Sequence, residues 1–209
     1  HEIKNPLTPI QLSAERIRHK FENKLTQDDS NVLERSTNTI INQVNALKIM
    51  VNEFAEYARP PKIQKDAIRI EELTEEVIDL YEMEAQIEVI KSKNIPIIYA
   101  DKNKLRQVII NLLENSRDAL KGIKKPKISI YINKKIKEVE FIVEDNGIGI
   151  PDEIIGRIFE PYVTSKQTGT GLGLAVVHKI IEEHDGKINI ERIKKSGTRV
   201  KINLKIENK

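Results

Sequence analysis

The segment "VEFIVEDNGIGI", residues Val139 to Ile150, joins a strand pattern to a glycine turn, and the rest of the chain can be interpreted outward from it. Val139, Phe141 and Val143 share one parity, as the buried face of a strand requires. Asp145 continues this inward row. Because an unpaired buried carboxylate is very costly, Asp145 needs a donor, and the exocyclic amine of adenine is one. The alternative is an ordinary loop aspartate, which "DNG" alone would favour.

Two sets of glycines accompany this aspartate. Gly147 and Gly149 let the backbone turn and approach a flat base closely, because glycine has no Cβ. Downstream, "GTGLGLA" places Gly169, Gly171 and Gly173 at the start of a helical pattern, where unpaired N–H groups and the helix dipole favour phosphates. Glycine triplets are weak indicators by themselves. A Rossmann fingerprint would follow a strand directly, whereas here a loop precedes the glycines. A Walker loop would contain Gly-Lys-Ser/Thr, which is absent from this sequence.

A long helix is predicted over "DKNKLRQVIINLLENSRDALKG", with Asp101 as its N-cap and Gly122 at its end. Asn111, Asn115 and Asp118 stand four and three residues apart and therefore share one face of it. Apolar residues cover the other face. Asparagine on an exposed helix face is most often only solvated, so the neighbouring motifs decide whether this face has a function.

Strands and helices alternate through the rest of the second half without a regular βαβ repeat. A short strand and a helix are predicted in "IRIEELTEEVIDLYE", a strand in "IPIIYA", a strand in "KISIYIN" and a helix in "GLGLAVVHKIIEEHDG". "KINIERI" and "TRVKINLKI" flank Lys-Ser-Gly as a hairpin. This order favours a mixed sheet with helices on one face, an α/β sandwich.

The first sixty residues have a different period. Apolar residues recur at steps of three and four, the spacing of a bundle seam, in the runs Ile3, Leu7, Ile10, Ala14, Ile17, Phe21 and Ile40, Val44, Leu47, Val51, Phe54, Ala58. The polar stretch 23–31 between them predicts a turn and hence an antiparallel hairpin. Since one hairpin cannot bury its own seam, we expect a homodimeric four-helix bundle. "ARPPK", residues 58–62, ends the second helix. The predicted fold class is α+β, with the hairpin over 1–60 and the sandwich over 61–209.

Composition narrows the function classes. The chain has 209 residues, 39% of them hydrophobic and 32% charged, which fits a soluble globular protein, and its apolar runs are too short to span a bilayer. Its net charge of +3 comes from 35 basic and 32 acidic residues that are interspersed, so no nucleic-acid partner is predicted. The absence of cysteine excludes disulfides and thiolate metal sites. Because it opens on histidine, the chain is expected to be a fragment of a longer protein.

Five motifs in order resemble the signature boxes of the sensor histidine kinases of two-component systems. "HEIKNPLTPI" is similar to their H box, and "NLLENSRDA", "DNGIGI", "FEPYVTSK" and "GTGLGLA" are similar to their N, G1, F and G2 boxes. The opening "HEIKNPLTPIQLSAERIRHKF" most resembles nitrogen-regulation sensors of the NtrY type. The resemblance covers nearly the whole chain. It implies a HisKA-type dimerisation domain followed by a Bergerat (GHKL) ATPase domain, the fold shared with gyrase and mismatch-repair ATPases.

By motif position, the resemblance implies a site for ATP or ADP with Mg²⁺. Its nucleotide-binding residues would be Asn111, Asn115, Asp145, Gly147, Gly149, Lys166, Gly169, Gly171, Gly173 and Thr198. Asn115 would coordinate Mg²⁺, with Asn111 supporting it, and Asp145 would accept from the adenine amine. Gly147 and Gly149 would shape the adenine pocket.

The resemblance also assigns a lid to residues 159–166, with Lys166 reaching the phosphates. Thr198 belongs to the row of alternate residues that faces inward along its strand. The resemblance implies that it corresponds to a hydroxyl residue of the family that helps hold adenine. Many relatives carry a lysine or arginine near the phosphates after the second asparagine. Here that stretch is Ser116, Arg117, Asp118, so no phosphate contact is assigned to it.

The opening His-Glu pair has two interpretations. A zinc-protease helix would need a second histidine at the position of Asn5, and four scattered histidines without cysteine make a poor metal site. The resemblance implies instead that His1 attacks the γ-phosphate of ATP and that Glu2 takes or orients the imidazole proton. Asn5, one turn on, would orient water against the phospho-aspartate of a partner. Pro6 and Pro9 each remove a helix hydrogen bond and predict a bend.

The implied function is ATP-dependent autophosphorylation of His1 and phosphoryl transfer to an aspartate of a response regulator receiver domain, with phosphatase activity toward that regulator. The expected setting is the cytoplasmic portion of a membrane-anchored bacterial sensor, joined to the membrane through upstream segments outside this sequence. Two alternatives stay open. One is an ATPase of the same fold that uses water as acceptor, and the other is a dimeric scaffold that holds nucleotide without turnover.

Overall fold

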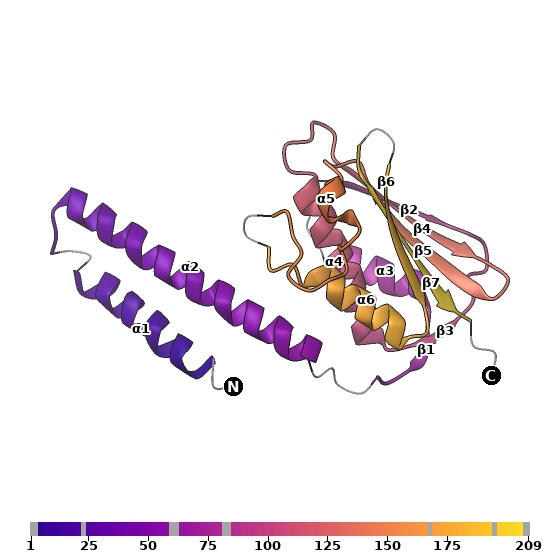
Figure 1. Ribbon diagram of the computed structural model, residues 1–209, viewed down its shortest axis with the longest axis horizontal. Coiled ribbons are helices and arrows are strands. Elements are labelled where there is room, and N and C mark those ends of the chain that lie inside the picture. The colour runs from indigo at the N-terminus through magenta and orange to yellow at the C-terminus, as the bar shows by residue number, and fades with distance from the viewer. Residues whose placement is uncertain are drawn as a thin grey trace. The chain divides into compact units, whose positions relative to one another are not determined.

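Figure 1 shows the computed structural model, which describes residues 4–21, 24–58, 63–80, 85–166, 169–193 and 196–206. The chain divides into two compact units, His1–Pro61 and Lys62–Lys209. The first is helical, and the second contains all the strands found among the described residues. Among the described helices, none is long and apolar enough to cross a membrane.

The helical unit is an antiparallel pair of helices, α1 (Lys4–Phe21) and α2 (Gln27–Ala58). Lys48 Nζ donates to Gln11 Oε1 at 2.6 Å, and Arg18 donates to Asn38 Oδ1 at 2.9 Å, so residue numbers rise along one helix as they fall along the other. The side chains buried between the helices are Leu7, Ala14, Thr37 and Val44. The predicted hairpin is confirmed, and α1 runs through Pro9 without interruption.

The turn is shorter than the sequence suggested, because α2 begins at Gln27 inside the stretch 23–31 that was predicted to be polar turn. Thr26 Oγ1 accepts from the backbone N–H of Asp29 at 3.3 Å and donates to its Oδ2 at 2.6 Å. The bond from the Asp29 N–H is an N-cap hydrogen bond, in which a short polar side chain satisfies a free N–H group of the first helical turn. A capped first turn therefore has the composition of a loop.

The second unit is an α/β sandwich. Its elements are β1 (Asp66–Ile68), α3 (Ile70–Asp79), β2 (Gln86–Lys91), β3 (Ile98–Ala100), α4 (Lys102–Ala119), β4 (Lys127–Lys134), β5 (Glu138–Asp145), α5 (Asp152–Ile155), α6 (Gly173–Glu183), β6 (Lys187–Arg192) and β7 (Thr198–Lys205). The main sheet has the order β2-β4-β5-β7-β6, in which only the β2–β4 pair is parallel, and β1 pairs with β3. Figure 1 shows α3, α4 and α6 on one face of this sheet. The predicted mixed sheet with helices on one face is confirmed.

Strand alternation builds the core. The antiparallel register places Val143 of β5 between Ile130 of β4 and Val200 of β7, and all three are buried. From the helix side, α4 contributes the buried residues Leu105, Val108, Ile109, Leu112 and Leu113. The same alternation carries Asp145, the last residue of β5, onto this inward face.

His184 fixes the end of α6 to the start of α4. Its buried ring accepts a hydrogen bond at Nε2 from the Asp101 backbone N–H at 2.9 Å, so Nδ1 carries the proton and donates to Ile180 O at 2.7 Å. Asp101 in turn caps α4, accepting from Asn103 N and Lys104 N. The two helices that flank the candidate site are therefore locked together at the end remote from Asp145.

Strand β2 was not foreseen from the sequence. It is an edge strand paired only with β4, and none of its side chains is fully buried. An edge strand needs charge on its exposed positions, and "QIEVIK" carries a glutamate and a lysine for that reason. Its apolar signal is correspondingly weak.

Candidate functional site

Asp145 is the most deeply buried acidic side chain that the described residues contain, with 6% of its surface exposed. Its Oδ1 accepts from the backbone N–H of Gly147 at 2.9 Å and from that of Thr198 at 3.3 Å. The hydroxyls of Ser116 and Thr198 also bond to the carboxylate. Burial raises the pKa of Asp145, and these donors offset part of that rise. The carboxylate is thus held in one orientation by four donors from three elements.

Close backbone approach explains the glycines around Asp145. A Cβ on Gly147 would lie 2.5 Å from the carbonyl oxygen of Ala119, because this turn packs on the end of α4. Gly197 has φ +112, and a Cβ there would lie 2.0 Å from the carbonyl oxygen of Asp145 itself. Gly149, with φ +76, sits against Gly197. Around Asp145, therefore, backbone segments pack directly against one another without side chains between them.

The amide face of α4 meets the start of α6. A Cβ on Gly173, the first residue of α6, would lie 3.5 Å from Asn111 Oδ1 and 4.0 Å from Asn115 Nδ2. The N-cap position, Leu172, makes no side-chain cap hydrogen bond. Backbone N–H groups at this helix start therefore lack a side-chain cap and can bind an anion there.

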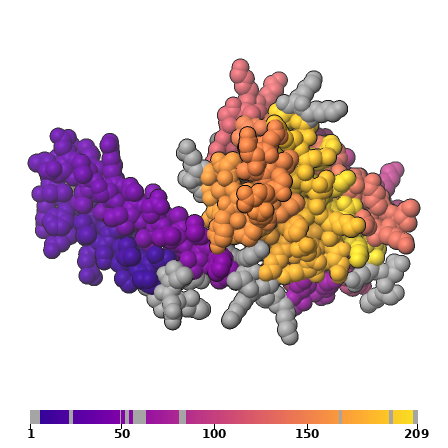
Figure 2. Space-filling model, in the orientation of Figure 1, coloured from indigo at the N-terminus to yellow at the C-terminus, as the bar shows by residue number. Residues whose placement is uncertain are grey.

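The loop before α6 joins the site through Gly171 and Lys166. Gly171, with φ +69, packs on the backbone of Tyr162, whose N–H donates to Gly171 O at 3.1 Å. Lys166 Nζ donates to Asn115 Oδ1 and to Asp118 Oδ2, both at 2.8 Å. In the space-filling view this part of the chain, coloured orange, forms a surface beside the C-terminal strands (Figure 2).

Asp118 is the anionic member of this group. Burial raises its pKa, but ion pairs with Lys121 and Lys166 outweigh that effect, so the pKa of Asp118 is lowered overall. Lys121 Nζ lies 2.8 Å from Oδ1 and Lys166 Nζ lies 2.8 Å from Oδ2. The carboxylate therefore stays ionised and holds two ammonium groups at once.

The structure brings the predicted residues of the second unit together in two adjoining groups. Asp145, Gly147, Gly149 and Thr198 form one, at the ends of β5 and β7. Asn111, Asn115, Lys166 and Gly173 form the other, with Gly169 beside Lys166, where a Cβ would lie 3.1 Å from the Lys166 Cβ. His1 and Glu2 lie outside the described residues. Asn5 lies in α1, and its side chain is likewise outside the description.

Three residues of the site were missed in the sequence. Ser116, buried next to Asn115 in the chain, bonds to Asp145, and only its neighbourhood to that asparagine could have suggested it. Gly197 precedes Thr198 in "KSGT", where it was interpreted only as hairpin turn. Asp118 was placed on the correct helix face but given no partner, because Lys166 is 48 residues away in the chain.

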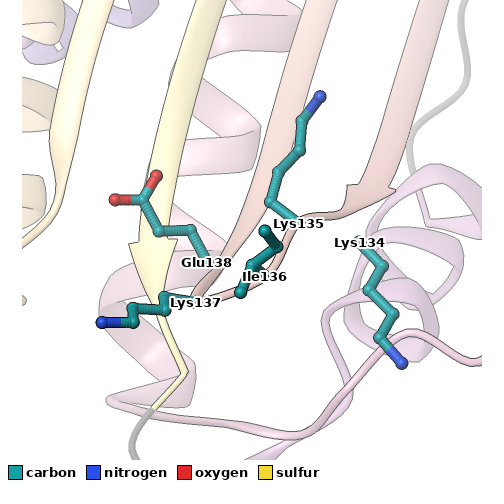
Figure 3. A pocket seen from close by; sticks show the side chains of 5 residues that line it. All are labelled: Lys134, Lys135, Ile136, Lys137 and Glu138. Carbon is teal, nitrogen blue, oxygen red and sulfur yellow. The ribbon is translucent and has the colours of Figure 1, made fainter.

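A hollow of about 760 Å³ lies elsewhere, at the turn that joins β4 to β5. Its lining is Lys134, Lys135, Ile136, Lys137 and Glu138, and Figure 3 shows the three lysine side chains pointing away from one another. It is at the opposite end of β5 from Asp145. Polar groups do not converge on it, so it is not the site that the motifs describe.

Comparison with known families accounts for both units. Residues 100–208 match the model of the histidine kinase-, DNA gyrase B- and HSP90-like ATPases, and residues 1–62 match the His Kinase A (phospho-acceptor) domain. The chain belongs to the sensor histidine kinases. The predicted family and fold class are confirmed.

Individual relatives show which histidine kinases the chain is similar to in sequence. It is 38% identical to the nitrogen regulation protein NtrY of Azorhizobium caulinodans over 99% of this chain and 28% of that protein. It is 31% identical to sporulation kinase A of Bacillus subtilis over 98% of this chain and 33% of that one. The chain therefore spans about a third of the length of these relatives. The predicted likeness to NtrY is confirmed.

A solved structure extends the likeness to three dimensions. The histidine kinase ThkA, crystallised in complex with the response regulator protein TrrA, superposes with a TM-score of 0.72 at 28% identity. The match covers 99% of this chain and 59% of that one. It includes both units, and so supports the order of helical hairpin and α/β sandwich.

Proposed function

We propose that this chain is the catalytic portion of a histidine kinase that binds ATP in the α/β unit, phosphorylates His1 and passes the phosphoryl group to an aspartate of a response regulator. The observation that carries the proposal is the presence of two complementary parts on one chain. A phospho-acceptor domain match covers residues 1–62, and the α/β unit carries two adjoining polar groups, Asp145 with Thr198 and Asn115 with Lys166. Neither part alone would distinguish a kinase from an ATPase.

Adenine is assigned to the Asp145 group. The carboxylate is buried and oriented, so its remaining acceptor capacity can meet an exocyclic amine without further reorganisation. The close packing of Gly147 on α4 and of Gly197 on Asp145 leaves the pocket wall without side-chain bulk. A flat base bound there would be recognised by one charged hydrogen bond and by shape.

The phosphates are assigned to the Asn111, Asn115 and Gly173 group. The N-terminal N–H groups of α6 supply donors and partial positive charge, and Lys166 supplies a full charge. The donor set also fits Mg²⁺, because the Asn115 amide oxygen already accepts from a cationic group. Asn115 would hold the metal with Asn111 beside it. When bound, the metal would neutralise the charge of the phosphates.

The acceptor part needs a second copy of the chain. Outside the buried seam of the hairpin, α1 and α2 carry a second apolar row whose members are Ile10, Ile17, Ile40, Leu47 and Phe54, each between 43% and 50% exposed. The spacing of seven residues within each helix is that of a four-helix bundle seam. We therefore propose a homodimer through α1 and α2.

His1 is the proposed nucleophile, Glu2 its proton acceptor and Asn5 the residue that orients water for phosphatase chemistry. These roles rest on the phospho-acceptor domain match and on the H-box motif of the sequence. The partner assignment draws on ThkA, whose structure was solved with a response regulator. For this chain, the expected partner is a receiver domain with a phosphorylatable aspartate. The proposed setting is the cytoplasmic part of a bacterial sensor, which upstream segments would anchor to the membrane.

Labelling with γ-labelled ATP tests the kinase proposal. A phosphohistidine is labile in acid and stable in alkali, so the expected result is protein-bound label with that stability. Release of inorganic phosphate without labelled protein would indicate instead the ATPase that uses water. Bound nucleotide with neither product would indicate the scaffold. Each alternative from the sequence thus has its own outcome.

Asn5→Ala tests the phosphatase part. Asn5 stands four residues after His1 in the sequence but is neither nucleophile nor base, and a neutral amide can hold a water by one donor and one acceptor contact. Because Asn5 has no proposed part in the attack on ATP, we expect autophosphorylation to stay within about threefold of the parent chain. Dephosphorylation of the regulator in the presence of ADP should slow markedly. Equal loss of both activities, in a variant shown to be dimeric, would mean that Asn5 shapes α1.

A further inference from the structure

Lys166 links the loop before α6 to the face of α4. Its ammonium nitrogen lies 2.8 Å from Asn115 Oδ1 and 2.8 Å from Asp118 Oδ2. Its backbone is also held, because Lys166 N–H donates to Thr164 Oγ1 at 3.0 Å. The side chain therefore makes two specific hydrogen bonds from a fixed starting point.

The charged partner explains why the ammonium group lies there. A neutral amide oxygen attracts an ammonium group weakly, whereas an ionised carboxylate forms a charge-assisted bond. Asp118 is ionised. It lies three residues after Asn115 in α4 and therefore on the same face of the helix. The ion pair with Asp118 Oδ2 therefore places the Lys166 ammonium group within hydrogen-bond distance of Asn115 Oδ1.

The Asn115 oxygen is the atom assigned to Mg²⁺. An amide oxygen has two lone pairs, but a divalent metal binds oxygen at about 2.1 Å, so a metal and an ammonium group on the same oxygen would be close neighbours of like charge. Coulomb repulsion at such a separation is strong in a partly buried site. The two cations therefore compete for the Asn115 oxygen.

We propose that Asp118 is a positioning residue that holds the Lys166 ammonium group on the Asn115 amide oxygen, so that Lys166 and a divalent metal are alternative cations at this oxygen. This inference rests on the proposed nucleotide site. It assigns a role to an acidic residue in the stretch to which no phosphate contact was assigned from the sequence. It also makes the position of the loop before α6 depend on the metal, because the loop lysine leaves Asn115 when the metal arrives.

Lys121 offers a matched control. It pairs with the other oxygen of the same carboxylate, Asp118 Oδ1, at 2.8 Å, and it is 76% exposed. Within the described part of the chain, Lys121 makes no hydrogen bond to Asn115. Lys121→Met and Lys166→Met remove the same charge from the same carboxylate, and differ in the contact with Asn115.

The experiment measures ADP affinity by calorimetry on the full chain, once in EDTA and once across a series of Mg²⁺ concentrations. In EDTA, Lys166→Met should weaken ADP binding about tenfold, the equivalent of one charge-assisted hydrogen bond. At saturating ADP, the same variant should need several-fold less Mg²⁺ for its half-maximal effect, since the competing ammonium group is gone. Lys121→Met should stay within about twofold of the parent chain in both measurements.

A double-mutant cycle tests the part played by Asp118. In an Asp118→Asn background, Lys166→Met should change ADP affinity in EDTA by less than about threefold, because the lysine is no longer held at the site. An undiminished tenfold effect would overturn the positioning role. Equal effects of Lys166→Met and Lys121→Met would overturn the competition at Asn115. Failure of the parent chain to bind ADP under any condition would overturn the proposed nucleotide site, and this inference with it.

Discussion

The two units of this protein bury their apolar residues in different ways. In the α/β unit, the inward rows of β4, β5 and β7 are between 0% and 8% exposed, and α3, α4 and α6 lie on that face. In the hairpin, Leu7, Ala14 and Val44 are buried, but a second row that includes Leu47 stays about half exposed. One unit completes its core within the chain, and the other presents half of a seam.

Because of this difference, we expect nucleotide binding to depend on the α/β unit alone and phosphoryl transfer to depend on the dimeric hairpin. The α/β unit holds its proposed nucleotide residues on a closed core, so we expect it to bind ADP without a partner copy. The hairpin, which carries His1, should reach full stability only by association. Variants in one unit should therefore leave the property of the other nearly unchanged, and the following predictions test that separation.

The largest effect is expected from His1→Gln. Because His1 is the proposed phosphoryl acceptor, the variant should carry no acid-labile label from γ-labelled ATP. ADP affinity measured by calorimetry should equal that of the parent chain, since the nucleotide residues lie in the other unit. Persistent acid-labile label on the variant would disprove the nucleophile assignment.

Leu47→Glu should separate the two copies. A carboxylate at a seam position loses apolar burial in both copies and brings two like charges together, which should weaken dimerisation by about a hundredfold or more. Sedimentation analysis measures this directly, with ADP affinity as the check on the α/β unit. The matched control is Leu12→Glu, since Leu12 is 58% exposed and lies off the seven-residue row. Equal dissociation by both variants would contradict the seam.

Gly197→Ala should destabilise the α/β unit while the hairpin stays dimeric. Gly197 has φ +112, and the added Cβ would meet the Asp145 carbonyl at 2.0 Å, so the turn has to open. Backbone strain of this kind is worth about 1–3 kcal/mol in the free energy of unfolding. Gly156→Ala is the control, because nothing lies within 4 Å of the new Cβ. A Gly197 variant with the stability of the Gly156 variant would be incompatible with this geometry.

Asp145→Asn is expected to weaken ADP binding about tenfold, because a charge-assisted hydrogen bond to adenine becomes a neutral one. Burial raises the pKa of Asp145, so the parent chain should lose ADP affinity as the pH falls through that raised pKa. The asparagine variant should lack this loss. Since the ionised form is penalised by burial at neutral pH, the variant should also unfold at a higher temperature. Unchanged ADP affinity would move Asp145 out of the adenine pocket.

Much of the fold could be predicted because its elements carry local signals. Asp101 at the start of α4 and Gly122 after its end mark that helix without any tertiary information. The parity of Val139, Phe141 and Val143 gave β5 and the inward direction of Asp145, which the structure confirms. The predicted likeness to the histidine kinases depended likewise on short local sequence motifs.

The errors have the opposite cause. The start of α2 at Gln27 was mistaken for turn because a capped first helical turn is polar, and β2 was missed because an edge strand carries little apolar signal. In both cases the deciding hydrogen bonds involve a partner that composition does not reveal. For β2 that partner is β4, about 40 residues downstream.

By itself, the sequence determined the order of the elements, the two periods that divide the chain, and the residue types available for binding adenine, phosphate and metal. Those features follow from local propensity, capping and the spacing of apolar residues. Tertiary structure alone decided which of these residues touch. The β5–β7 register sets Thr198 opposite Asp145, and the fold of the loop before α6 brings Lys166 to Asp118 and Asn115. Contacts between residues about fifty positions apart depend on sheet register and helix packing, which no local pattern encodes.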